Sequence, residues 1–215
     1  MQRACCSSAR VVRTGRGLLI AVLLLAGPAV RAECGCLWQG SFAEVQVETD
    51  LVLAGTVTTR KGNAVDVVVE EVLRGDPFRD EVRVWMQTLD YCRPPAEEFP
   101  PGSRWVLALQ RIDEVIPGGF DPGTPNQSYG RVGDYYLSSC GGYWLSYQGD
   151  AVTGNLVNAP RWARDPDMTP VVIDLLRAFV GGTADAQDLL EASREDPALM
   201  ELRLNTKAFL RGDED

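Results

Sequence analysis

The sequence predicts a mainly β domain followed by a small helical annex. Segments rich in β-branched residues, separated by Gly, Pro and Asn turns, recur along the first two thirds of the 215-residue chain. From Thr169 onward, apolar residues instead follow helical spacing. Four cysteines lie downstream of the N-terminal leader, an even number that indicates a disulfide framework in an oxidising compartment.

Residues 1–32 are predicted to be a signal peptide. Four arginines precede the apolar run Leu18–Ala26, and Val30-Arg31-Ala32 offers the small residues of a cleavage site. The run is too short to span a bilayer, which takes about 20 residues, so a retained anchor is the less favoured alternative. We therefore expect a secreted or periplasmic protein, cleaved after Ala32, with no membrane association after cleavage.

The charge and the missing histidines exclude several functions. The full chain has a formal net charge of −9, and the leader carries five arginines and no acids, so residues 33–215 have a charge of −14. Such a chain is poorly suited to bind nucleic acid or an anionic membrane, because their phosphates require a basic surface. The absence of histidine excludes Ser-His-Asp catalysis and histidine-ligated metals.

The β domain is expected to span residues 33–160. A short helix over 41–50 begins with Ser41 as its cap, and Glu44 completes a capping box. Strands are expected at 51–59, 64–72, 81–86 and 105–112. The segments 135–139 and 143–147 form a fifth strand or a hairpin around Gly141-Gly142.

Residues 161–215 are expected to form the annex. Thr169-Pro170 predicts the start of a helix whose apolar stripe is Val172, Leu175, Leu176 and Phe179, and Gly181-Gly182 ends it. Further helices are expected at 183–194 and 196–212. About 45 helical residues are too few to be stable alone, so the annex should pack on the β domain.

Cys34 and Cys36 are one residue apart, and a bond between them would close a strained ring. Each is therefore expected to bond to one of the two distant cysteines, Cys92 and Cys140, in either combination. The alternative is a redox-active Cys34/Cys36 pair, which would leave the distant cysteines unexplained.

Five ordered motifs within residues 34–148 resemble netrin-like domains, the group that includes the tissue inhibitors of metalloproteinases and their bacterial relatives. The motifs are Cys34-Gly35-Cys36, Thr49–Val57, Val69–Gly75, Phe99 and Gly102 ahead of the strand Trp105–Leu109, and Tyr136–Cys140. The resemblance implies a five-stranded barrel of the oligonucleotide/oligosaccharide-binding (OB) type. It also implies the pairs Cys34–Cys92 and Cys36–Cys140.

In those inhibitors the free amine and the carbonyl of an N-terminal cysteine chelate the catalytic zinc of the protease. The resemblance thus points to a candidate inhibitory ridge, formed by Glu33, Cys34, Gly35, Cys36 and Leu37. This chain departs from the pattern because cleavage after Ala32 leaves Glu33 ahead of Cys34.

We expect binding and not catalysis, with no cofactor and no metal site. The partner is expected to be a protein, and an extracellular metalloprotease is the class that the resemblance implies; the sequence does not give the oligomeric state. Acidic pairs such as Glu70-Glu71 are expected to be solvated, and an aromatic cluster is expected to pack across one hairpin: Tyr129, Tyr135, Tyr136, Tyr143, Trp144 and Tyr147. The alternatives are a thiol-redox enzyme, a carboxylate hydrolase and a purely structural envelope module.

Overall fold

The structure is a computed structural model that describes residues 35–88, 91–117, 119, 128–158, 170–194, 201 and 206. The chain divides into two compact units, Met1–Glu33 and Cys34–Asp215, and every described residue belongs to the second. The predicted signal peptide, Glu33 and Cys34 lie outside the described residues, as does most of the predicted helix 196–212.

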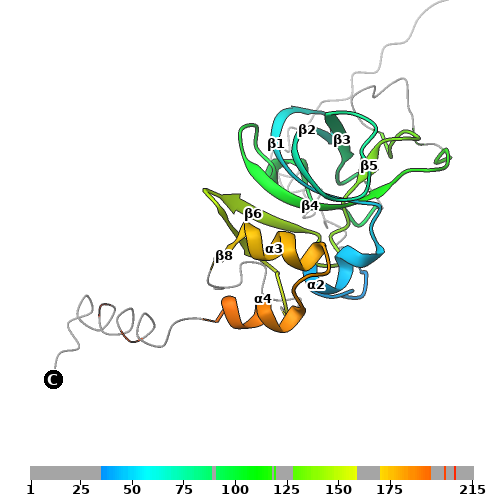
Figure 1. The fold of residues 1–215 in the computed structure, drawn as a ribbon. Coiled ribbons are helices and arrows are strands. Elements are labelled where there is room, and N and C mark those ends of the chain that lie inside the picture. The colour runs from blue at the N-terminus through cyan, green and yellow to red at the C-terminus, as the bar shows by residue number, and fades with distance from the viewer. Residues whose placement is uncertain are drawn as a thin grey trace, which may run out of the picture. The chain divides into compact units, whose positions relative to one another are not determined.

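Five strands close into a barrel, so the predicted fold class is confirmed (Figure 1). The order around the barrel is β1-β2-β3-β5-β4, and β4 pairs back with β1. All pairings in this ring are antiparallel except β3 with β5. The strands are β1 Leu51–Lys61, β2 Ala64–Arg74, β3 Glu81–Trp85, β4 Arg104–Arg111 and β5 Tyr135–Tyr136.

The hairpin of β1 and β2 follows the predicted pattern. Gly62 has a φ of 62°, the left-handed conformation that a tight turn favours in glycine. Along β2, Val65 and Val67 are buried while Val68 is exposed, which is the alternation expected of a strand with one face in the core. Closing the ring through β1 and β4 leaves neither strand with a free edge along the paired stretch.

The predicted hairpin around Gly141-Gly142 is wrong. β5 and β6 (Trp144–Gln148) do not pair with each other, because both pair with the same strand, β4. β5 lies along the C-terminal end of β4 and β6 along its N-terminal half. The segment between them leaves the sheet and carries Cys140.

The sheet continues beyond the barrel through β6, β7 (Ala151–Gly154) and β8 (Val171–Val172), and reaches the annex. The predicted start of the annex helix at Pro170 is wrong, because Val171 pairs with Val152 of β7 and helix α3 begins at Ile173. The stripe is corrected accordingly: Val172 is exposed and Ile173 is buried in its place. The annex helices are α3 Ile173–Val180 and α4 Ala186–Ala192.

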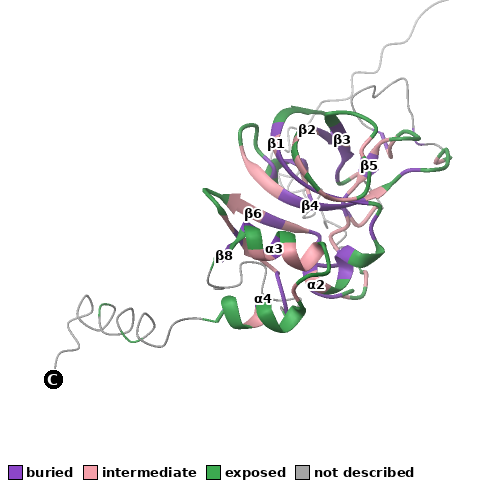
Figure 2. Cartoon of the chain, in the orientation of Figure 1, coloured by how far each residue is buried: buried purple, intermediate pink, exposed green. Residues whose placement is uncertain are grey.

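One hydrophobic core joins the barrel to the helices. Leu176 of α3 and Leu189 of α4 are fully buried in the same cluster as the barrel strands. The annex therefore packs on the β domain, as expected, and most of α4 is exposed whereas α3 carries buried and half-buried residues (Figure 2). Arg177 adds a surface ion pair between α3 and Glu71 of β2.

Helix α2 (Phe42–Val45) continues into the short 3-10 helix η1 (Gln46–Glu48), and the predicted capping box is present. The Glu44 carboxylate accepts hydrogen bonds from the Ser41 backbone N–H (2.8 Å) and from Ser41 Oγ (3.0 Å). Phe42 then points into the core. A further 3-10 helix, η2 (Ala96–Glu98), interrupts the proline-rich segment after Cys92.

Asp66 on β2 should make stability depend on acid pH. Arg83 donates hydrogen bonds to both of its carboxylate oxygens (2.7 and 2.8 Å), and Thr59 donates one more. The bonds from Arg83 hold the pKa of Asp66 below its usual value, although partial burial acts in the opposite direction. Because the folded-state pKa is depressed, this stabilisation is complete above the unfolded pKa of about 3.9 and disappears as the pH falls through the lower folded value.

Asp66→Asn should therefore lower the free energy of unfolding at neutral pH, and the difference from the parent should be smaller at about pH 2. Urea unfolding of both proteins at the two pH values measures this. An equal difference in the free energy of unfolding at both pH values would contradict a lowered pKa of Asp66 in the folded protein.

Candidate functional site

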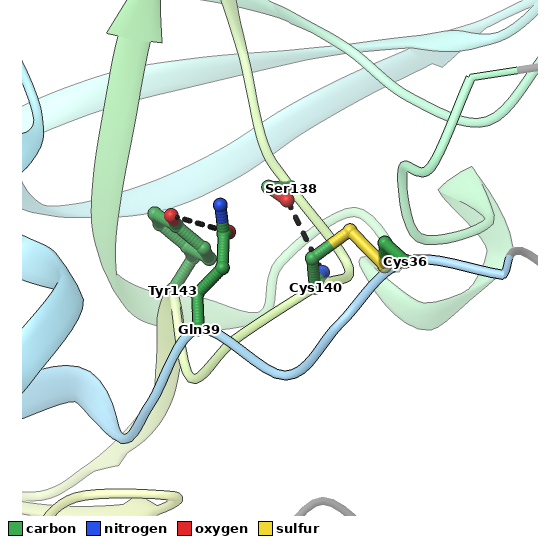
Figure 3. The surroundings of a disulfide bond; sticks show 5 residues. All are labelled: Cys36, Gln39, Ser138, Cys140 and Tyr143. Carbon is green, nitrogen blue, oxygen red and sulfur yellow. Dashed lines mark hydrogen bonds between the residues drawn. A yellow bond between two sulfur atoms is a disulfide. The ribbon is translucent and has the colours of Figure 1, made fainter.

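The N-terminal segment from Gly35 to Gln39 is bonded to the loop between β5 and β6. Cys36 forms a disulfide with Cys140, with 5.8 Å between the two Cα atoms, and the bridge spans 104 positions of sequence. Figure 3 shows this bridge beside Ser138, whose Oγ accepts a hydrogen bond (3.1 Å) from the Cys140 backbone N–H. This bridge is one of the two pairs that the netrin-like resemblance implies.

Hydrogen bonds made by residues just after Cys36 hold the same segment. The Gln39 N–H donates to the Cys140 carbonyl (2.7 Å), and the Gly142 N–H donates to the Gly40 carbonyl (2.9 Å). The Tyr143 hydroxyl donates to Gln39 Oε1 (2.8 Å), as Figure 3 shows. The Tyr143 side chain is buried, and this burial raises the pKa of its phenol. Its hydroxyl therefore needs a partner, and Gln39 supplies one.

Cys92 lies beside this bridge. It is also disulfide-bonded, and its sulfur lies within 4.8 Å of the sulfurs of Cys36 and Cys140. The Ser139 N–H donates to the Cys92 carbonyl (2.9 Å), so the two cysteine-bearing loops are connected through their backbones as well. Cys34 lies outside the described residues, and the Cys34–Cys92 pair stays a prediction.

The described part of the predicted ridge is Gly35, Cys36 and Leu37. Gly35 is exposed, and a side chain added there would meet nothing within 4 Å. Leu37 has 86% of its surface exposed although it immediately follows the bridged cysteine. A segment held by the Cys36–Cys140 disulfide and by the hydrogen bond from Gln39 to Cys140 thus presents one apolar side chain, Leu37, to solvent.

Sequence analysis did not identify Arg93 as part of this region. Its guanidinium lies against the rings of Tyr91 (4.7 Å) and Tyr136 (4.8 Å), and its Nη1 donates to the Tyr129 carbonyl (2.7 Å). Nε has no hydrogen-bond partner among the described residues. Burial lowers the pKa of Arg93 to about 10, so it remains charged at neutral pH. Arginine is mostly exposed in proteins, so its position after Cys92 gave no signal of burial.

The aromatic cluster packs, but not across one hairpin. Tyr135 and Tyr143 are buried in the core, the ring of Tyr129 packs at a tilt of 44° against Tyr91, and Trp144 meets Phe99 edge to face. Tyr147 lies under the guanidinium of Arg104 (4.0 Å). Arg104 and Tyr147, together with Trp105, line a surface hollow of about 530 Å³ at the N-terminal end of β4.

Both members of the acidic pair Glu70-Glu71 have arginine partners at the surface. Glu70 accepts from Arg104 (2.6 Å) and Glu71 from Arg177 (2.5 Å), so the two neighbouring carboxylates point to different partners. Hydrogen bonds from Arg104 hold the pKa of Glu70 below its usual value. A general acid requires a carboxyl with a raised pKa, and Glu70 is shifted the other way.

Within the described residues, no helix combines the length and apolar character needed to cross a bilayer. No family model, curated protein or solved structure matches this chain. The closed barrel is what the structure shows, and the netrin-like resemblance stays a prediction.

Proposed function

We propose that this chain is an exported, disulfide-stapled binding module whose ridge, Glu33 to Leu37, contacts a protein partner. The observation that carries the proposal is Leu37, which is 86% exposed on a segment joined to the barrel by the Cys36–Cys140 bridge. Binding is less costly when the contacting segment is already ordered, because little conformational entropy is then lost on association. An apolar side chain on such a segment suits a pocket on a partner.

An extracellular metalloprotease is the partner class that the netrin-like resemblance favours. A catalytic zinc keeps an open coordination position for a ligand. The amine of Cys34 can occupy that position only if Cys34 is the first residue of the mature chain, because the amine is otherwise part of a peptide bond. Mass spectrometry of the exported protein tests this. A mature chain that starts at Cys34 supports chelation, and one that starts at Glu33 rules it out while leaving the ridge available for other contacts.

A thiol-redox enzyme that uses a Cys34/Cys36 pair is less well supported, because Cys36 bonds to Cys140 and not to Cys34. Titration of the purified protein with a thiol reagent separates the two functions. Zero free thiols favour the binding module, and a reactive pair favours the enzyme. A purely structural envelope module would bind no partner through Leu37.

Leu37→Asp should weaken capture of the partner by at least about tenfold, equivalent to about 1.4 kcal/mol. The reason is that the apolar contact is replaced by a charge that must be desolvated. Because Leu37 is exposed, the free energy of unfolding of the Leu37→Asp variant should stay within about 0.5 kcal/mol of that of the parent. Surface-immobilised protein, loaded with the extracellular fraction of the source organism, measures capture; residual zinc-endopeptidase activity in the flow-through measures inhibition.

Val115→Asp is the matched control, since Val115 is also apolar and 82% exposed but lies in the loop after β4. Equal capture by the parent and by Leu37→Asp would contradict a ridge centred on Leu37.

A further inference from the structure

The three described cysteines form a compact sulfur cluster. The sulfurs of Cys36, Cys92 and Cys140 all lie within 4.8 Å of one another, and they are the one such group of three potential metal ligands among the described residues. Cys36 and Cys92 are half-buried and Cys140 is buried, so the cluster is shielded without being sealed. In the oxidised protein these sulfurs are used in disulfides.

The spacing is close to that of a metal site. In a tetrahedral thiolate site the metal–sulfur distance is about 2.3 Å, which places neighbouring sulfurs about 3.8 Å apart. If the bridges were opened, the bonded sulfurs would move apart and the third would need to approach by at most about 1 Å to reach this geometry. Rotations about the Cα–Cβ bonds are sufficient for such shifts.

The backbone holds the three cysteines together independently of their sulfurs. The Ser139 N–H donates to the Cys92 carbonyl (2.9 Å), and the Gln39 N–H donates to the Cys140 carbonyl (2.7 Å). Leu137 and Tyr143, on either side of Cys140, are buried in the core. These contacts favour proximity of the three thiols after reduction, which lowers the entropy cost of bringing them to one ion.

We propose that the reduced form of this cluster binds a thiophilic d10 ion such as Zn²⁺ or Cd²⁺, with Cys36, Cys92 and Cys140 as thiolate ligands. A dithiol reductant supplies two electrons and two protons to each bridge and is itself oxidised to a disulfide. Each thiol then releases its proton as it binds the ion, and a water molecule or another donor fills the fourth position. The chain would then have two alternative states, an oxidised stapled form and a reduced metal-bound form.

Cadmium titration of the exported protein tests the site, because cadmium–thiolate bonds absorb in the ultraviolet. The protein is reduced with a phosphine, which takes up oxygen from water and is removed before anaerobic titration. We expect one Cd²⁺ per reduced chain and none for the oxidised protein. Near-ultraviolet circular dichroism of the same samples reports the packing of the barrel; if reduction alone unfolds it, one equivalent of Cd²⁺ should restore the folded signal.

Cys92→Ser removes one ligand and leaves Cys36 and Cys140. Loss of a group that only hydrogen-bonds to a metal ligand already lowers metal affinity by about 10–100-fold. Loss of a direct ligand should therefore weaken Cd²⁺ binding by at least about tenfold. Ser139→Ala, next to Cys140, is the matched control and should bind as the parent does. The reduced parent in denaturing urea keeps its thiols but loses their placement, and should also bind at least tenfold more weakly. Equal affinity in urea or in Cys92→Ser, or failure of the reduced parent to form a one-to-one complex, would overturn the proposal.

Discussion

Replacing Cys36 and Cys140 together with serine should lower the free energy of unfolding by about 5 kcal/mol. The bridge closes a loop of 104 positions, and in the chain-entropy model a loop of this size restricts the unfolded chain by about that amount. A domain of ordinary stability, about 5–15 kcal/mol, would lose a large share of it. The double substitution avoids the free thiol that either single change would create.

Urea unfolding of the parent and the double variant, both with Cys92 unchanged, measures the loss. We also expect weaker capture of the partner, because the segment that carries Leu37 becomes less ordered. A loss under about 1 kcal/mol would show that the hydrogen bonds of Gln39 and Gly142 hold this segment without the bridge.

Phe42→Ala should lower the free energy of unfolding by about 3–5 kcal/mol. Phe42 is fully buried at the start of α2 and belongs to the core cluster that joins the barrel to the helices. Removing its ring leaves a cavity that the surrounding β-strands cannot readily close, since they are tied to each other by backbone hydrogen bonds.

Phe78→Ala is the matched control for this change. Phe78 carries the same side chain but is 93% exposed in the loop between β2 and β3, so the effect should stay within about 0.5 kcal/mol. Thermal or urea unfolding of the two variants compares them directly. If both lost the same stability, the difference in burial would not be the cause.

The first four strands could be predicted from the sequence because each carries its own local signal. Val65 and Val67 alternate with polar or exposed neighbours, and Gly62-Asn63 marks the turn before them. Such patterns depend on residues close together in the chain, and they indicate which face of a strand is buried. The capping box of Ser41 and Glu44 is local in the same way.

The region around Cys140 could not be predicted, because its conformation depends on distant residues. Gly141-Gly142 has the composition of a hairpin turn, but a Cβ atom on Gly142 would lie 2.7 Å from the Phe42 backbone nitrogen and 2.6 Å from the Asn155 oxygen. Glycine is required there for close approach of other backbones, and the turn interpretation fails. Likewise, Pro170 suggested a helix start, and only pairing with β7 shows that Val171 is in a strand.

The candidate site was predicted in part. Of the Cys-Gly-Cys motif, Cys36 anchors the N-terminal segment as expected, because cysteine type and spacing are visible in sequence. The burial of Arg93 between Tyr91 and Tyr136 arises where the loop after β3 meets strand β5. The sequence contains no sign of that meeting.

The two-residue strand β8 also determines where the chain can be shortened. Val171 and Val172 pair with Val152 and Ala151 and so cover one edge of β7. A chain ending at residue 160, the predicted end of the β domain, would leave that edge with unpaired backbone N–H and C=O groups. Uncovered edges of this kind pair with strands of other molecules, which leads to aggregation. A shortened protein for solution work should therefore end after α4 and not at residue 160.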